Sequence, residues 1–266
     1  MHKFWLERIK GKNLFIFIGI SILLICLQFF SGAWKTMRFV NSDTIDITPY
    51  TQWLGSSIET NMGMLFYFVL PLLASLGGAT IYNEDKKQGY FYLIYSKITI
   101  KRYFTTLITI VFCLSFLITS LVLILNLILN FMVLPAYNPV ESLDIGLNFT
   151  YGNTLFPSFY YSHPLVYTGM YIILSALFSG LFAIVTLTIS LYVENFFVVV
   201  SSVFLVQLVL MVIGFMTNIA ISPAHFLMER GDIASVSFVY ILLFYILSLV
   251  ATLVFYVIGV KKNVIK

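Results

Sequence analysis

The chain alternates long apolar runs with short polar segments, and six of the runs reach the roughly 20 residues that an α-helix needs to cross a bilayer. Between the fourth and fifth runs only Val193, Glu194 and Asn195 remain, which indicates a tight turn with Glu194 as its one charge. The sequence predicts an all-α integral membrane protein with a single transmembrane domain over residues 1–266. Its spans are expected at about residues 14–33, 62–82, 104–131, 167–192, 196–219 and 238–260.

Composition supports the membrane assignment. Hydrophobic residues make up 60% of the chain and charged residues 10%, whereas about a quarter of the residues of a soluble globular protein are charged. A water-soluble fold of this length would need far more polar surface to cover its core. We therefore expect the lipid bilayer to be one partner of the chain. The net charge of +4 does not indicate nucleic acid, because the bases cluster beside the spans.

The distribution of Lys and Arg predicts the orientation. Twelve of the 15 basic residues fall in the N-terminal arm, in residues 83–103 and in the C-terminal tail, and three fall in the alternate segments. Because basic residues favour the inner side of a membrane, both termini are expected in the cytoplasm. The arm Met1–Asn13 has apolar residues at near-helical spacing and predicts an interfacial elbow helix. The alternative is the charged region of a signal peptide, but the following apolar run is longer than such peptides carry.

The outer segments differ from one another. Residues 132–166 carry no base and are dense in Tyr, Phe, Pro, Gly and Asn, which predicts an ordered outer cap anchored by aromatic rings; a surface that meets substrate is the sharper alternative. Residues 220–237 mix an apolar half with three charges, and the apolar half is expected to dip back as a short re-entrant helix.

The segment Asn83–Tyr103 holds seven charged residues between two apolar runs. A helix lying along the inner face needs an apolar side for the membrane domain and a polar side for a soluble partner, and this segment offers both. It must also be stiff enough to transmit a rigid-body push to the second and third spans. The alternative is an ordinary positively charged inner loop without a partner.

Within this segment, Glu84, Gly89, an apolar group (Tyr90–Tyr95), Ser96, Ile98 and the basic pair Lys101 and Arg102 form a pattern that resembles the permease subunits of the type-2 ATP-binding-cassette (ABC) exporters. The chain departs from that pattern at Lys97 and Ile100, where the family commonly has proline and arginine. The resemblance also covers the elbow helix, six spans with both ends inside, and the re-entrant outer segment. It implies a cytoplasmic coupling helix between spans two and three that docks on an ATPase subunit. The residues expected to make this contact are Glu84, Asp85, Lys86, Lys87, Gly89, Tyr90 and Phe91, with Glu194 as a second cytoplasmic contact.

The chain lacks the motifs of catalysis. The phosphate-binding pattern G-x-x-x-x-G-K-[ST] is absent, and so are H-E-x-x-H, G-x-S-x-G and any Cys/His cluster. We expect no cofactor and no metal on this chain, with ATP and Mg on the partner ATPase. His225 and Glu229 are four residues apart, but two ligands without a third are weak evidence for a metal site; a local hydrogen bond or an exposed pair is the plainer interpretation.

No Lys, Arg, Asp or Glu falls within a predicted span. Ion-coupled carriers usually keep one for the coupling ion, so a channel or carrier that works unaided is disfavoured. The polar residues that remain are Gln28, Asn126, Asn130 and Gln207. Such amides more often hydrogen-bond neighbouring helices; a place along a transport pathway is the alternative. Small residues four apart, such as Ser175 with Ser179 and Ala176 with Gly180, predict close helix packing.

These patterns lead to one principal hypothesis and one alternative. The first is a permease half that pairs with a second copy or a sister permease and with two ABC ATPase subunits, exporting an amphipathic or apolar cargo such as a peptide, antibiotic or lipid. Export of antimicrobial peptides, or protection against them, is the preferred cargo assignment. Lys outnumbers Arg in a chain rich in Ile, Phe, Asn and Tyr, which points to the plasma membrane of a low-GC Gram-positive bacterium. The alternative is a non-transporting membrane scaffold or assembly protein.

Overall fold

The computed structural model describes residues 11–40, 47–57, 60–77, 81–87, 99–139, 153–230 and 236–264. Within these ranges the chain is helical apart from turns and irregular connections. The predicted elbow helix in the N-terminal arm, and the part of the inner segment over residues 88–98, lie outside the described residues. The helices are α2 (Lys12–Ser31), α3 (Ala33–Thr36), η1 (Met37–Phe39), α4 (Pro49–Gln52), α5 (Met62–Leu76), α6 (Ile81–Lys87), α8 (Ile100–Val133), α9 (Pro157–Ser162), α10 (Pro164–Ser190), α11 (Phe196–Thr217), α12 (Pro223–Phe226) and α13 (Phe238–Val264).

Among the described residues, six helical segments are long and apolar enough to cross a membrane. They agree with the predicted spans to within a few residues, so the prediction of a multi-pass, all-helical membrane protein is confirmed. The second span comprises α5 and the first residues of α6, and it runs over Met62–Asn83. The third, α8, has 34 residues and is therefore about 51 Å long at 1.5 Å per residue. A hydrocarbon core is about 30 Å thick, so α8 extends beyond it.

Local sequence signals mark where several helices begin and end. Proline occupies the first turn of α4, α9, α10 and α12, where its missing N–H costs no intrahelical hydrogen bond. The side chain of Asn195 accepts from the N–H of Phe197 at 3.0 Å and caps the start of α11. Asn218 ends α11 in the left-handed conformation, with φ of 53°, which asparagine tolerates better than most residues.

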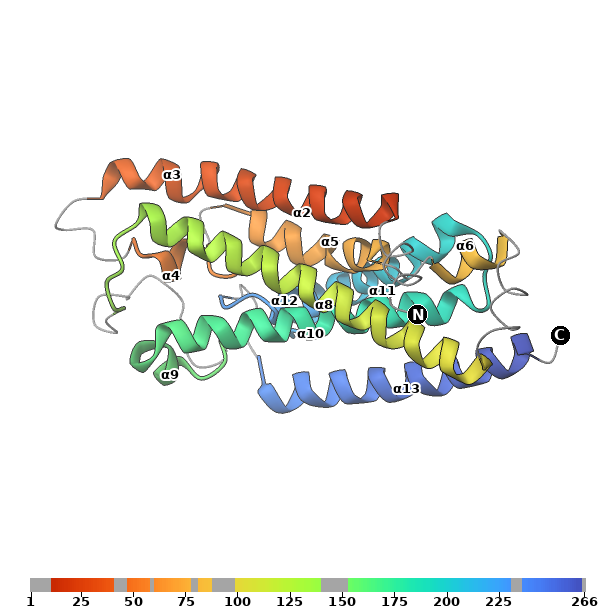
Figure 1. The fold of residues 1–266 in the computed structure, drawn as a ribbon. Helices are drawn as coiled ribbons and strands as arrows, with labels where there is room; N and C mark the ends of the chain where they lie inside the picture. Colours follow the sequence, from red (N-terminus) through yellow and green to blue (C-terminus); the bar gives the residue numbers. More distant parts are fainter. Residues whose placement is uncertain are drawn as a thin grey trace.

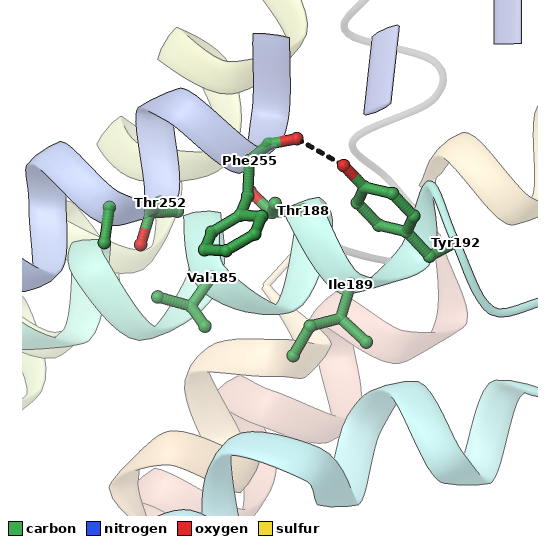
Figure 2. A pocket seen from close by; sticks show the side chains of 7 residues that line it. Val185, Thr188, Ile189, Tyr192, Thr252 and Phe255 are labelled. Atoms are coloured by element: carbon green, nitrogen blue, oxygen red, sulfur yellow. Dashed lines mark hydrogen bonds between the residues drawn. The ribbon is translucent and has the colours of Figure 1, made fainter. Parts of the chain in front are cut away.

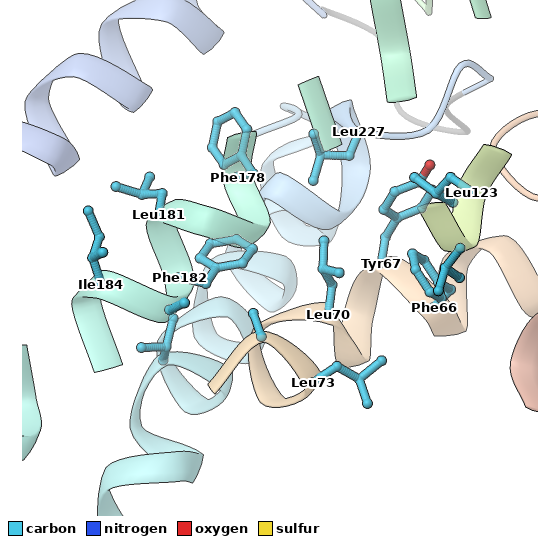
Figure 3. Packing of buried hydrophobic residues seen from close by; sticks show 14 of the residues in the cluster. Phe66, Tyr67, Leu70, Leu73, Leu123, Phe178, Leu181, Phe182, Ile184 and Leu227 are labelled. Atoms are coloured by element: carbon cyan, nitrogen blue, oxygen red, sulfur yellow. The ribbon is translucent and has the colours of Figure 1, made fainter. Parts of the chain in front are cut away.

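Helix α10 is the centre of the bundle. Of its most apolar stretch, 72% is buried within the protein, against 17% for α13 and 22% for α11. It packs against α8, α5, α11 and α13. Phe178, Leu181 and Phe182 of α10 meet Leu70 of α5 and Leu227, which follows α12 (Figure 3). The outward faces of α11 and α13 carry exposed Leu, Val, Ile and Phe side chains, as expected for surfaces that contact lipid.

Small residues allow α10 to approach its neighbours, as the four-residue spacing predicts. A Cβ on Gly180 would lie 2.5 Å from the ring of Phe112 on α8. The hydroxyl of Thr119 donates to Ser179 at 2.7 Å, and Ser179 donates to the carbonyl of Ser115 at 3.3 Å. Within a bilayer the hydrophobic effect does not drive helices together, so close packing and interhelical hydrogen bonds must stabilise their association.

The two ends of the bundle are built differently (Figure 1). We call one the α6 end: it holds α6, the turn between α10 and α11, the start of α8 and the last residues of α13. We call the other the α4 end: it holds α4, α9 and the loop of residues 53–57. Helix α2 begins and α13 finishes at the α6 end, so the first and last described helices approach the same side of the bundle.

At the α4 end the connecting segments fold back into the helices. Trp53, Leu54 and Ser56 are fully buried, as are Ala224 of α12 and the adjoining Leu227. A Cβ on Gly63 would lie 2.3 Å from the carbonyl oxygen of Leu54, so the missing side chain lets the loop lie against the start of α5. The short helix predicted in residues 220–237 is present as α12, packed against α5 and α11.

Candidate functional site

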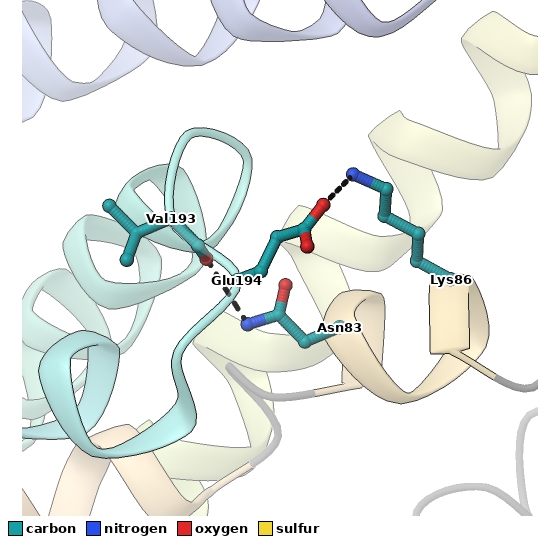
Figure 4. Close-up of polar contacts among 4 residues, drawn as sticks. All are labelled: Asn83, Lys86, Val193 and Glu194. Carbon is teal, nitrogen blue, oxygen red and sulfur yellow. Dashed lines mark hydrogen bonds and ion pairs between the residues drawn. The ribbon is translucent and has the colours of Figure 1, made fainter.

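The described part of the predicted coupling segment is α6, which lies against the turn between α10 and α11. Lys86 Nζ is 2.6 Å from Glu194 Oε1, with side chains 45% and 75% exposed. Asn83 Nδ2 donates to the carbonyl of Val193 at 3.5 Å. Figure 4 shows both contacts joining α6 to the same three-residue turn. The two segments proposed separately as cytoplasmic contacts are therefore neighbours in space.

On its other side α6 is held by the start of α8. Tyr103 Oη donates to Asp85 Oδ2 at 2.5 Å, and both side chains are buried. Breaking a hydrogen bond between two buried groups leaves unpaired polar atoms in the interior, so this contact fixes α6 relative to α8. Asp85 therefore supports the segment from within, whereas Lys86 beside it is exposed to solvent.

An aromatic cluster extends the support to α13. The ring of Phe104 lies 5.9 Å from Tyr82 of α6 and 6.1 Å from Tyr256 of α13, and Tyr256 Oη donates to the Phe104 carbonyl at 2.7 Å. Edge-to-face and tilted ring pairs at such distances each add about 0.5–1.5 kcal/mol beyond the area that they bury. Parts of four helices, α6, α8, α10 and α13, therefore meet in one packed unit at the α6 end.

A pocket of about 250 Å³ opens beside this unit, between α10 and α13. Tyr192, which immediately precedes the turn held by α6, forms part of its wall, and Tyr192 Oη donates to the carbonyl of Phe255 at 2.7 Å. Figure 2 shows this bond closing one side of the pocket. The lining is almost entirely apolar and consists of Val185, Thr188, Ile189, Tyr192, Ala251, Thr252 and Phe255.

Several predicted coupling residues cannot be placed. Gly89, Tyr90 and Phe91 lie outside the described residues, and the side chains of Glu84 and Lys87 are likewise outside the description although their backbone belongs to α6. Within the described part, sequence reasoning missed Asn83 and Tyr103, which hold α6 to the turn and to α8. The signal that could have found Tyr103 is its position directly after the basic pair, at the start of an apolar helix.

The four amides considered for a transport pathway are fully or almost fully buried, and each donates a hydrogen bond within the chain. Gln28 Nε2 donates to the Gln52 carbonyl at 2.6 Å, and Asn126 Nδ2 donates to Gln28 Oε1 at 2.7 Å. Gln207 Nε2 donates to the carbonyls of Tyr67 and Phe68 at 2.8 and 3.0 Å, and Asn130 Nδ2 donates to the Asn126 carbonyl at 2.8 Å. Gln28, Asn126 and Gln207 bond neighbouring helices and loops, as the sequence favoured, whereas Asn130 bonds to Asn126 of its own helix.

His225 and Glu229 do not form an exposed pair, which corrects that expectation. Helix α12 ends at Phe226, so the two residues share no helical face, and both side chains are buried. The ring of His225 lies 4.8 Å from that of Phe215 on α11. Across the described ranges, no group of three or more His, Cys, Asp or Glu side chains is placed to hold a metal ion.

Comparison with known proteins adds no relative: no protein-family model, no curated protein and no solved structure matches the chain. The functional argument therefore depends on the residues and their geometry.

Proposed function

We propose that this chain is the membrane permease subunit of an ATP-driven exporter, and that a separate cytoplasmic ATPase subunit, present in two copies, drives it through α6 and the turn at Glu194. The observation that carries this proposal is the construction of the α6 end. There α6, whose described side chains are buried except for the exposed Lys86, is bonded on one side to the turn between α10 and α11 and on the other to α8. A force applied to such a helix reaches several spans as one rigid body.

The charges of this surface suit a soluble protein partner. Lys86 and Glu194 are both accessible, and an exposed ion pair contributes only about 0–1 kcal/mol to stability, so a partner can replace it with its own charges at little cost. Asp85 and Tyr103 are buried beneath the pair and keep the backbone of α6 in place. In the proposal, Lys86 and Glu194 contact the ATPase, and Asp85 and Tyr103 hold α6 in position.

The proposal also specifies the orientation, the membrane, the second permease and the cargo. The α6 end is the cytoplasmic end, as the distribution of basic residues predicts, and the membrane is a bacterial plasma membrane. A second permease, identical or a sister chain, completes the complex. The cargo is amphipathic or apolar, in keeping with the apolar faces of the helices and the apolar pocket beside Tyr192, and antimicrobial peptides are the preferred class.

The test is to co-express the chain with any ATPase encoded beside it, to purify the two together, and to measure ATP hydrolysis in lipid vesicles with and without cargo peptides. Lys86→Glu should reduce copurification and cargo-stimulated hydrolysis by at least several fold, and Glu194→Lys in the same chain should not restore it, because the partner's charges remain unchanged. Lys35→Glu, which changes an exposed charge elsewhere in the fold, is the matched control. A chain that purifies alone, and whose Lys86→Glu variant leaves every neighbouring ATPase unaffected, would support the scaffold alternative.

A further inference from the structure

A carboxylate is buried at the α4 end, where two loops distant in sequence meet. Glu229, three residues beyond the end of α12, has no exposed side-chain surface. Trp53 Nε1 donates to Glu229 Oε2 at 2.9 Å, and the backbone N–H of Glu229 donates to the carbonyl of Gly55 at 2.8 Å. These two bonds join the loop of residues 53–57 to the segment that leads into α13.

Two hydroxyl groups lie near the buried carboxylate. Ser56 of the loop and Thr168 of α10 lie beside the carboxylate and favour its ionised form, yet neither hydroxyl reaches full hydrogen-bond geometry with it. Among the described residues, Glu229 Oε1, Ser56 Oγ and Thr168 Oγ1 are all buried without a hydrogen-bond partner. A buried carboxylate in this setting is costly while it is charged, and a proton on Oε1 would provide a donor directed at these oxygens.

Other ionisable groups face Glu229 from the surrounding elements. Arg230, its buried neighbour, attracts the negative charge. Tyr67 of α5 and Tyr167 and Tyr171 of α10 interact electrostatically with the carboxylate. The balance is decided by burial, which raises the pKa of Glu229 to about 7 against the opposing effects of Trp53, Thr168, Arg230 and Ser56.

We propose that Glu229 is a proton-binding site that holds the loop of residues 53–57 and the segment after α12 together at the α4 end. With the proton bound, the neutral carboxyl group bridges the loop of residues 53–57, the segment after α12 and α10 in a dry interior. When the proton leaves, the charge in the interior favours water entry and separation of the two loops. The ligand is the proton itself, and the site is independent of the ATPase contact at the other end of the bundle.

The sequence analysis weighed Glu229 only with His225, as a possible metal ligand or as part of a local hydrogen bond or exposed pair, and did not predict its burial against the loop of residues 53–57. Glu229 lies between the fifth and sixth helices, in a segment that also carries two other charges. The neighbouring residues in the sequence do not distinguish an exposed acid from a buried one in this segment. Trp53 and Gly55 lie 176 and 174 positions earlier in the chain than Glu229. Their contacts with Glu229 in the folded protein make its carboxyl group part of the interior.

The experiment is an infrared titration of the full-length chain in lipid nanodiscs, following the carbonyl band of protonated carboxyl groups from pH 4 to pH 9. The wild type should keep one carboxyl band that disappears with a midpoint near pH 7. Glu229→Gln should lack this component, while Glu194→Gln, which removes an exposed carboxylate, should retain it. A wild-type chain with no carboxyl group titrating above about pH 5.5, where ordinary carboxyl groups are already ionised, would overturn the proposal.

A second variant keeps the test decisive if Glu229→Gln does not fold. Trp53→Phe removes the N–H that favours the ionised carboxylate while leaving an aromatic ring in the loop. Its titration midpoint should rise by about half a pH unit or more, because losing a hydrogen bond to a charged form disfavours that form. An unchanged or lowered midpoint would show that the titrating group is not the one held by Trp53, and the proposal would fail.

Discussion

The exposed ion pair at the α6 end contrasts with the enclosed polar groups at the α4 end, although the α6 end also encloses the hydrogen bond from Tyr103 to Asp85 beneath its surface. At the α6 end the described ion pair, Lys86 with Glu194, is open to solvent, and water can replace either partner. At the α4 end the polar groups are enclosed: Asn126 Oδ1 accepts from the N–H of Leu54 at 2.8 Å, and Glu229 accepts from Trp53. Exposed contacts can be exchanged at little cost, whereas enclosed ones leave unpaired groups in the interior when they break. The α6 end is therefore built to accept a partner, and the α4 end to hold one arrangement.

The largest effect is expected from Asn126→Ala. This change leaves both Gln28 Oε1 and the Leu54 N–H without the partner that they now have, and each unpaired buried group costs about 1–3 kcal/mol. The melting temperature in detergent should fall by several degrees. Asn130→Ala, one turn further along α8, is the matched control, because Asn130 donates only to the carbonyl and side chain of Asn126. If the melting temperature fell equally in Asn126→Ala and Asn130→Ala, the role assigned to the hydrogen bonds of Asn126 with Gln28 and Leu54 would be wrong.

The next effect concerns the pH dependence of stability. Burial raises the pKa of Glu229 to about 7 from its ordinary value of 4.5, so between these two values this group binds more protons in the folded chain than in the unfolded chain. The stability that Glu229 contributes is therefore fully present below pH 4.5 and is lost as pH rises, by at most ~1.4 kcal/mol per pH unit, until the carboxyl group is ionised above pH 7. The difference in melting temperature between wild type and Glu229→Gln should follow this curve.

Glu194→Gln is the control for that measurement. It removes one carboxylate of the same type from an exposed position, so its melting temperature should run parallel to that of the wild type across the same pH range. If the curves for Glu229→Gln and wild type were also parallel, the distinction drawn between an enclosed and an exposed carboxylate would be wrong.

A smaller effect is expected in the middle of the bundle. In Gly180→Ala the new Cβ would lie 2.5 Å from the ring of Phe112, and overpacking of this kind typically costs about 1–3 kcal/mol. Gly169→Ala on the same helix meets no atom within 4 Å, so it should be neutral or stabilising by about 0.5–1 kcal/mol, because alanine favours the helix. Thermal melting of the two variants separates these outcomes, and a destabilised Gly169→Ala would argue against steric contact as the cause.

The smallest effect is expected at the α6 end. Lys86→Ala and Glu194→Ala should each change stability by less than about 1 kcal/mol, and the double variant should show a coupling of similar or smaller size, since the pair is exposed and screened by salt. The measurement is a double-mutant cycle of thermal melts at low and high salt. A coupling several times larger would mean that this contact holds the fold together, and the contrast between the two ends would disappear.

The sequence predicted the spans and the close packing at small residues, but not which residues pair across the bundle, and the particular residues show why. A run such as residues 164–190 is apolar along its length, and this can be recognised from the residues of the run alone. The bond between Gln28 and Asn126 joins residues 98 positions apart, so neither residue alone predicts it. Lys86 and Glu194 were both expected at the cytoplasmic surface, yet their pairing depends on how α6 meets the turn after α10. Glu229 was the hardest case, because its burial depends on a loop from the first quarter of the chain.

The bond between Trp53 and Glu229 has a consequence for synthesis of the protein. The ribosome delivers the indole long before its carboxylate partner, with 176 positions between them, and by then four further membrane helices have been inserted. Until residue 229 has been made, the indole of Trp53 has no carboxylate acceptor, and the unfinished chain leaves this aromatic side chain exposed. The contact can therefore close only after the fifth membrane helix has been made, with the sixth still to follow.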